Sequence, residues 1–146
     1  MRLGKPFDLI WVGSLLTHLD SAGWDSFLPF FAEHLVPGGL LVVTIHGRYH
    51  AESFRGNEHF PNFRMTSQAR ARVLSDYDQT GFGYSDYPGQ DGYGLSIANP
   101  SYVVDRLLRL APSLRLVTYT ERAWRGTHDI VTCQRGYTRR LTSDAP

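Results

Sequence analysis

The chain has 146 residues, of which 42% are hydrophobic and 20% charged, and its formal net charge is +1. This composition fits one globular domain with a real core and excludes a disordered chain. The near-neutral charge excludes strong electrostatic recruitment of nucleic acid or anionic membrane. The single cysteine, Cys133, cannot form an internal disulfide or a cysteine zinc site, and agrees with a reducing, cytoplasmic setting. No segment reaches the roughly 20 apolar residues of a membrane span.

Residues 7–12 are almost continuously apolar and predict a strand buried on both faces, as in a parallel sheet covered by helices. A helix follows, capped by Ser21 or Asp25, and its apolar residues recur at steps of three and four. They are Trp24, Phe27, Leu28, Phe31 and Leu35. Pro29 predicts either a late start or a kink in this helix.

Pro37-Gly38-Gly39 ends the helix and leads into a second buried strand over residues 39–45. Strand, helix and strand with short connections form a βαβ unit, whose crossover is right-handed. The first part of the chain therefore predicts a parallel β-pair.

The middle of the chain, about residues 47–98, predicts an irregular insert. Residues 47–65 show no clear period, and Thr66 or Ser67 then caps a helix. Residues 81–94 are rich in glycine and tyrosine and predict a long loop, which in a compact domain is more often functional than accidental.

Asn99-Pro100 begins a further helix, because asparagine caps and proline suits the first helical position. Its buried stripe comprises Val103, Val104, Leu107, Leu108 and Ala111. Strands over residues 114–119 and 129–133 follow. The short turn through Arg125-Gly126-Thr127 joins them into an antiparallel hairpin.

The order of these elements resembles the second half of class I (Rossmann-like) S-adenosylmethionine-dependent methyltransferases. Residues 7–19 resemble the fourth strand of that family and the turn after it. Residues 35–44, with Pro37-Gly38-Gly39, resemble the fifth strand, and the terminal hairpin resembles strands six and seven. The resemblance implies an α/β fold with a partial sheet of strands four to seven, parallel with a terminal antiparallel hairpin, in one partial domain over residues 1–146.

The same resemblance implies S-adenosylmethionine as cofactor and a small-molecule or glycan-like methyl acceptor. The family's first three strands, its Gly-x-Gly-x-Gly turn and its ribose-binding acidic residue have no counterpart here. We therefore expect a fragment, inactive alone, of a longer methyltransferase. A partner chain that supplies the missing half, or a decayed remnant, are the alternatives.

Loss of three strands exposes the edge of the first strand and one helix-facing surface, and such an edge invites pairing. A non-catalytic remnant or partner-docking module is therefore the alternative function. A nicotinamide-dependent reductase is a third interpretation, disfavoured by the terminal hairpin, although fold alone does not determine chemistry.

The candidate cofactor-binding residues are Gly13, Ser14, Leu15 and His18. Ligands of open α/β sheets bind outside the carboxyl ends of the strands, where residues 13–15 lie. The resemblance implies that this turn touches the adenosine of the cofactor, and that His18 matches a frequent family histidine. A plain strand-ending turn and a packed imidazole are the structural alternatives.

His46, at the carboxyl end of the second strand, is the candidate catalytic base, since an imidazole with an unperturbed pKa near 6.5 suits that role. Tyr84 and Tyr87, with Tyr93, are candidates for an aromatic wall over the acceptor, or else for anchoring the loop. His50, Glu58 and His59 fit no compact ligand spacing, so the sequence predicts no metal site.

Overall fold

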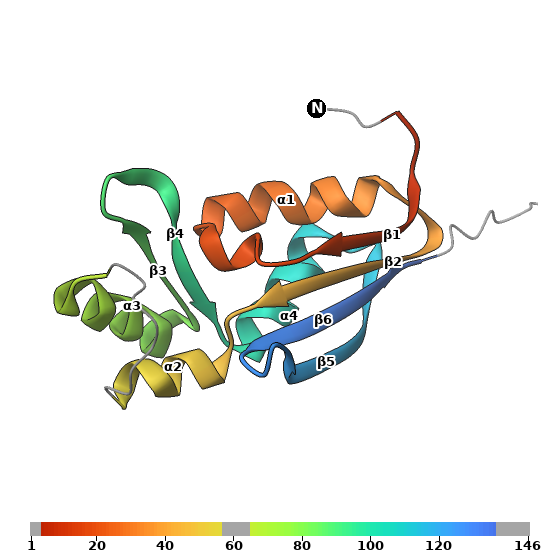
Figure 1. Cartoon of the computed structure of the whole chain (residues 1–146). Coiled ribbons are helices and arrows are strands. Elements are labelled where there is room, and N and C mark those ends of the chain that lie inside the picture. The colour runs from red at the N-terminus through yellow and green to blue at the C-terminus, as the bar shows by residue number, and fades with distance from the viewer. Residues whose placement is uncertain (1–3, 57–64, 137–146) are drawn as a thin grey trace, which may run out of the picture.

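The chain begins with the predicted βαβ unit. The computed structural model describes residues 4–56 and 65–136. Strand β1 (Phe7–Val12) is followed by the short 3-10 turn η1 (Leu16–His18), helix α1 (Ser21–Glu33) and strand β2 (Leu35–Ile45), and β1 and β2 pair in parallel (Figure 1). The predicted parallel pair is confirmed, and β2 begins earlier than expected because the Pro37-Gly38-Gly39 segment lies within it.

The main sheet has four strands in the order β1-β2-β6-β5. Strands β5 (Leu114–Trp124) and β6 (His128–Arg135) form the predicted antiparallel hairpin, and β6 also pairs antiparallel with β2. The pairing of Ile45 with Asp129 brings the turn before β6 to the carboxyl end of β2. The sheet therefore places residues from the end of the chain beside the end of its central strand.

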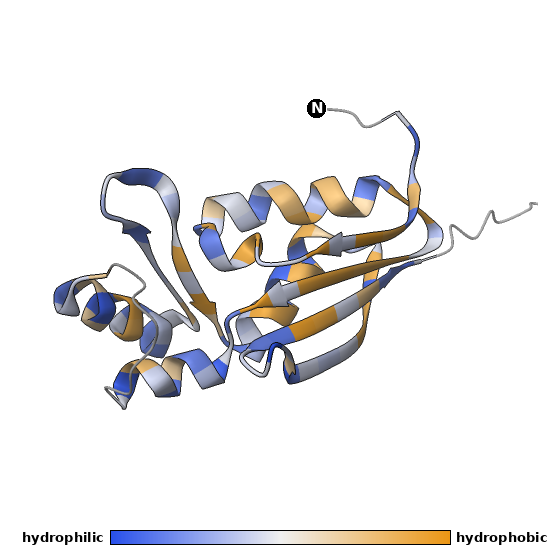
Figure 2. Ribbon diagram, in the orientation of Figure 1, coloured by the Kyte–Doolittle hydropathy of each residue, from blue (hydrophilic) through white to orange (hydrophobic). Residues whose placement is uncertain are grey.

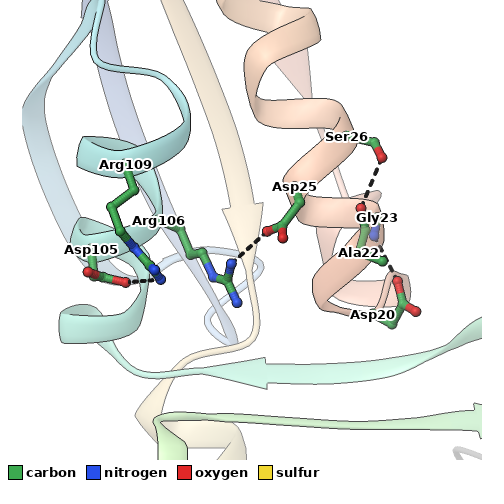
Figure 3. A network of polar contacts seen from close by, with 8 residues as sticks. All are labelled: Asp20, Ala22, Gly23, Asp25, Ser26, Asp105, Arg106 and Arg109. Carbon is green, nitrogen blue, oxygen red and sulfur yellow. Dashed lines mark hydrogen bonds and ion pairs between the residues drawn. The ribbon is translucent and has the colours of Figure 1, made fainter.

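Helices α1 and α4 (Pro100–Leu110) pack together on one face of this sheet, linked by an ion pair of 2.8 Å between Arg106 and Asp25 (Figure 3). Asp20 caps α1, since its side chain accepts a hydrogen bond of 2.7 Å from the Gly23 backbone N–H. The predicted caps Ser21 and Asp25 are therefore wrong, and Asp25 serves the interhelical contact instead. The helix includes Pro29, so the predicted late start is also wrong.

The core between this helical layer and the sheet is apolar. Its fully buried members include Trp24, Leu28, Leu41, Ile45, Val131 and Cys133. Leu108 was placed in the buried stripe of α4 but is 66% exposed, because Val103, Leu107 and Ala111 make up the inward-facing row and Leu108 lies off it.

The opposite face of the sheet carries no helix within the described residues. On β1, Phe7, Leu9 and Trp11 are 43%, 56% and 50% exposed, whereas Val12 is buried. Figure 2 shows that hydrophobic residues continue along β1 and β2. The prediction that β1 is buried on both faces is therefore wrong here: β1 is the edge strand, and its side chains alternate between the core and an open face.

The predicted irregular insert is largely regular. Helices α2 (Arg48–Arg55) and α3 (Ser67–Thr80) precede a hairpin of β3 (Phe82–Tyr87) and β4 (Gln90–Ala98), so the predicted loop over residues 81–94 is wrong (Figure 1). The predicted Thr66 cap is confirmed, since its hydroxyl accepts a hydrogen bond from the Ala69 N–H. No helix in the described ranges is long and apolar enough to cross a membrane.

The glycines of the β3–β4 hairpin are the reason why a loop was predicted there. In the structure they allow two backbones to pack closely. A Cβ on Gly83 would lie 2.0 Å from the backbone oxygen of Val73, and one on Gly94 would lie 2.0 Å from that of Ser85. Only a residue without a side chain permits such approaches within a strand. The turn glycine Gly89, at φ +74°, is the one that a tight hairpin turn requires.

Candidate functional site

The turn after β1 is held firmly against β2. The Ser14 backbone N–H donates a hydrogen bond of 2.8 Å to the hydroxyl of Thr44, and the Ser14 hydroxyl lies 3.1 Å from that of Thr17. Both threonines are fully buried. Ser14 adopts a positive φ of 56°, an uncommon conformation that these contacts hold in place. Residues 13–15 therefore form a rigid turn at the carboxyl end of β1, where they were predicted.

His18 meets the β3–β4 hairpin just beyond this turn. Its Nδ1 lies 2.8 Å from the Gly94 carbonyl oxygen and 3.3 Å from the Tyr87 hydroxyl, and its ring stacks on Tyr93 at 4.8 Å. Since a carbonyl only accepts, Nδ1 carries the proton. The structure thus brings a predicted cofactor residue together with two of the predicted aromatic residues.

The tyrosines of the hairpin divide into two groups. Burial, and then the nearby Tyr93, raise the pKa of Tyr87 to about 12, which keeps its hydroxyl neutral. Tyr84 instead packs against the main core, and its hydroxyl donates to Asp86. Burial, followed by this hydrogen bond, raises the pKa of Tyr84. Tyr84 therefore does not join Tyr87 and Tyr93 at His18.

His46 directly follows β2 and is only 2% exposed. Its Nδ1 lies 3.1 Å from the backbone oxygen of Ser96, whose hydroxyl donates a hydrogen bond of 2.8 Å to the Leu16 carbonyl. Strand β4 therefore ties the end of β2 to the turn after β1, at the edge of the sheet where both strands end.

Two further histidines surround His46. Its ring centroid lies 3.9 Å from that of His50 and 4.7 Å from that of His128. The ring nitrogens that these three residues offer all lie within 4.8 Å of one another. His50 comes from α2 and His128 from the start of β6, so three separate elements build this cluster of imidazoles.

The three imidazoles are neutral at neutral pH. Burial, and then repulsion from His50 and His128, lower the pKa of His46 well below its usual value. Burial, and then His128, lower the pKa of His50 to about 3, and burial is also the main cause of the lowered pKa of His128. The expectation of an unperturbed pKa for His46 is therefore wrong, because its ring is removed from solvent.

The sequence analysis did not identify His128, and it assigned His50 no role in a site. The four-residue spacing of His46 and His50 was an available signal, because the start of a helix at that spacing turns both side chains to one side. His128 carried no such signal, since only the register of β6 against β2 brings it there. Glu58 and His59 lie outside the described residues.

The buried Asp129 braces the same region. It accepts hydrogen bonds from the Tyr119 hydroxyl at 2.7 Å and the Arg122 N–H at 2.9 Å. A Cβ on Gly47 would lie 1.8 Å from the Asp129 carboxylate, so the chain after His46 passes where only glycine fits.

Comparison with known proteins identifies the fold. No protein-family model matches the chain, and no curated protein matches its sequence. Among solved structures, the DhpI–SAM–HEP complex superposes with a TM-score of 0.51 at 11% identity, covering 91% of this chain and 52% of that one. A SAM-dependent methyltransferase from Methanosarcina mazei gives 0.50 at 16% identity, covering 92% and 63%.

An O-methyltransferase family protein from Burkholderia thailandensis also gives 0.50, at 10% identity, covering 92% of this chain and 32% of that one. The chain therefore spans between 32% and 63% of the length of these three structures. Its mixed α/β fold, with a parallel pair and an antiparallel hairpin, is that of class I methyltransferases, as predicted.

Proposed function

We propose that this chain forms part of the transfer site of an S-adenosylmethionine-dependent methyltransferase that acts on a small-molecule or glycan-like acceptor. The observation that carries the proposal is the convergence of residues 13–15, His18 and His46 at the carboxyl ends of the parallel pair β1–β2. Ligands of open α/β sheets bind at this edge. A sulfonium methyl is already activated, so the protein has mainly to align a nucleophile and exclude water.

On the cofactor side, we assign Gly13, Ser14 and Leu15 to the adenosine part of S-adenosylmethionine, with His18 beside them. The rigidity of the turn supports this assignment, because Ser14 is held by Thr44 and Thr17 before any ligand arrives. A preformed turn saves the ordering entropy that a mobile loop would lose on binding.

On the acceptor side, Tyr87 and Tyr93 are the aromatic wall, and Tyr84 is left as a core residue. His46 is the candidate proton acceptor. Because burial lowers its pKa, it would accept a proton effectively only from a group that is already acidic, and transfer to a weakly acidic hydroxyl would need further activation.

The contacts to the ribose and methionine parts of the cofactor fall, in this proposal, to residues outside the chain, because it spans less than two thirds of each matched structure. Catalysis then belongs to the completed protein. The buried thiol of Cys133 supports a reducing, cytoplasmic setting for it.

Titration of the 15N-labelled chain with S-adenosylhomocysteine, followed by amide chemical shifts, tests the cofactor side. We expect roughly millimolar affinity, with shifts at Gly13, Ser14, Leu15 and His18 and none at Gly126 in the far turn. The same titration with adenosine should shift the same amides. Absence of shifts at residues 13–15 at saturation would contradict the assignment, and nanomolar binding would contradict the incomplete site.

A second candidate function is a non-catalytic docking module, and the open edge of β1 favours it. Phe7 and Leu9, with Ile10, Phe30 and Phe31, line an apolar groove beside that edge. Unpaired edges with exposed apolar side chains recruit further strands. We infer that an apolar strand of a partner chain pairs with β1, and pairing between two copies of this chain is the form of this docking that can be measured directly.

Replacing Leu9 and Trp11 together by glutamate tests this edge. Light scattering on the purified chain should show self-association that the double variant abolishes, with an unchanged circular dichroism spectrum. Leu108→Glu is the matched control, since Leu108 is equally apolar and exposed but lies on α4. A wild-type chain that stays monomeric at high concentration would contradict pairing through the edge of β1.

A further inference from the structure

We propose that His46, His50 and His128 form a binding site for a divalent transition-metal ion, with zinc as the expected ion. The three side chains converge from β2, α2 and β6, and their ring nitrogens lie within 4.8 Å of one another. Imidazole is a preferred ligand of Zn²⁺, and a three-histidine set with one open position is a known arrangement of catalytic zinc.

The spacing suits an ion after a small adjustment. With Zn–N bonds of about 2.0–2.1 Å in tetrahedral geometry, ligand nitrogens lie roughly 3.4 Å apart. The observed separations, which are at most 4.8 Å, would therefore have to close by at most about 1.4 Å, a distance on the scale of a side-chain rotation.

Each imidazole also has an outer partner that orients it. His46 Nδ1 is hydrogen-bonded to the Ser96 carbonyl at 3.1 Å, and His128 Nδ1 lies 2.9 Å from the Thr127 hydroxyl. His50 is hydrogen-bonded to the Thr127 backbone. Metal-binding histidines characteristically engage one ring nitrogen in this way, which fixes the tautomer and presents the other nitrogen to the ion.

The protonation state and access are also suitable. Metal binding requires neutral imidazole, and burial keeps all three rings neutral at neutral pH. His46 and His50 are buried, whereas His128 is only partly buried, so an ion reaches the cluster from the β5–β6 turn. Since His46 Nδ1 faces the Ser96 carbonyl, a bound ion would occupy the same Nε2 that the proposed function gives to proton transfer, so metal binding and that role of His46 are alternatives. The test of metal binding needs no enzymatic activity.

The test uses the untagged 146-residue chain, stripped with a chelator and titrated with Zn²⁺ and with Co²⁺. We expect one equivalent of either ion, a visible Co²⁺ absorption band of four-coordinate type, and a rise in melting temperature with Zn²⁺. His50→Gln and His128→Gln should each weaken binding on the order of 100-fold and abolish the band. Thr127→Val should weaken it by roughly tenfold.

His34→Gln is the matched control, because His34 is also buried but lies away from the cluster, at the carboxyl end of α1. Its Nδ1 is hydrogen-bonded there to the Phe30 carbonyl. It should bind both ions as the wild type does. Retention of the Co²⁺ band in His128→Gln, or equal loss in His34→Gln, would overturn the site. His128→Gln replaces a partly buried side chain, and circular dichroism checks that it folds.

Discussion

Acidification of the metal-free chain from pH 7 to pH 5 should reduce its free energy of unfolding by roughly 4 kcal/mol from His46 and His50 alone. Each contributes about 2 kcal/mol, because the unfolded imidazole, with its pKa near 6.5, takes up a proton in this window while the buried one does not. His128 adds a smaller amount with the same sign.

The sign follows from the direction of the shifts. The folded pKa of His46 lies well below its usual value and that of His50 is about 3, so the unfolded chain binds more protons as the pH falls below about 6.5. Stability is therefore present at neutral pH and lost toward acid. Among the other groups that face the cluster, Arg125 also lowers the pKa of His128, and His18 lowers the pKa of both His46 and His128.

Urea unfolding at pH 7 and pH 5, in the presence of a chelator, measures this loss. His50→Gln removes one titrating group and should reduce the acid loss by roughly 2 kcal/mol. Burial raises the pKa of Asp129, which acts with the opposite sign, but the variant leaves Asp129 unchanged and so isolates the histidine contribution. Equal acid losses in wild type and variant would show that His50 titrates normally.

Trp24→Ala should destabilise the chain by about 4 kcal/mol, a large part of the 5–15 kcal/mol typical of a domain. Trp24 is 1% exposed, and its ring packs edge-on against Phe82 and Tyr102, at 5.9 Å from each. Its Nε1 donates a hydrogen bond of 3.0 Å to the Leu16 carbonyl. Truncation leaves a cavity where α1 meets β3, α4 and the turn after β1.

Two matched variants separate the causes in urea unfolding. Trp24→Phe keeps most of the apolar volume, and the Leu16 carbonyl still accepts from the Ser96 hydroxyl at 2.8 Å, so we expect a loss of about 1–2 kcal/mol. Trp11→Ala removes a half-exposed ring of the same size and should cost less than about 1 kcal/mol. Similar losses in Trp24→Ala and Trp11→Ala would mean that Trp24 is not the centre of this core.

The main architecture was predictable because it depends on local periodicity. Near-continuous apolar runs, separated by a helical stripe, are enough to predict the βαβ unit. Asn99-Pro100 and Thr66 mark two helix starts because their side chains satisfy backbone N–H groups locally. The hairpin β3–β4 was missed for the opposite reason: Gly83 and Gly94 resemble loop residues in sequence, and only the close approach of a distant backbone explains them.

The candidate site was likewise predictable from the sequence only in part. Positions 13–15, His18 and His46 were predictable because the ends of parallel strands in one sheet share an edge. The sequence by itself thus determined the strands of the main sheet, two helix starts and the edge at which we propose that ligands bind, since these follow from neighbouring residues. Only the tertiary structure decided that His128 joins His46 and His50, and that β1 keeps an open apolar face. Both depend on strand register and on which surfaces are covered, and these are set by contacts between residues far apart in the chain.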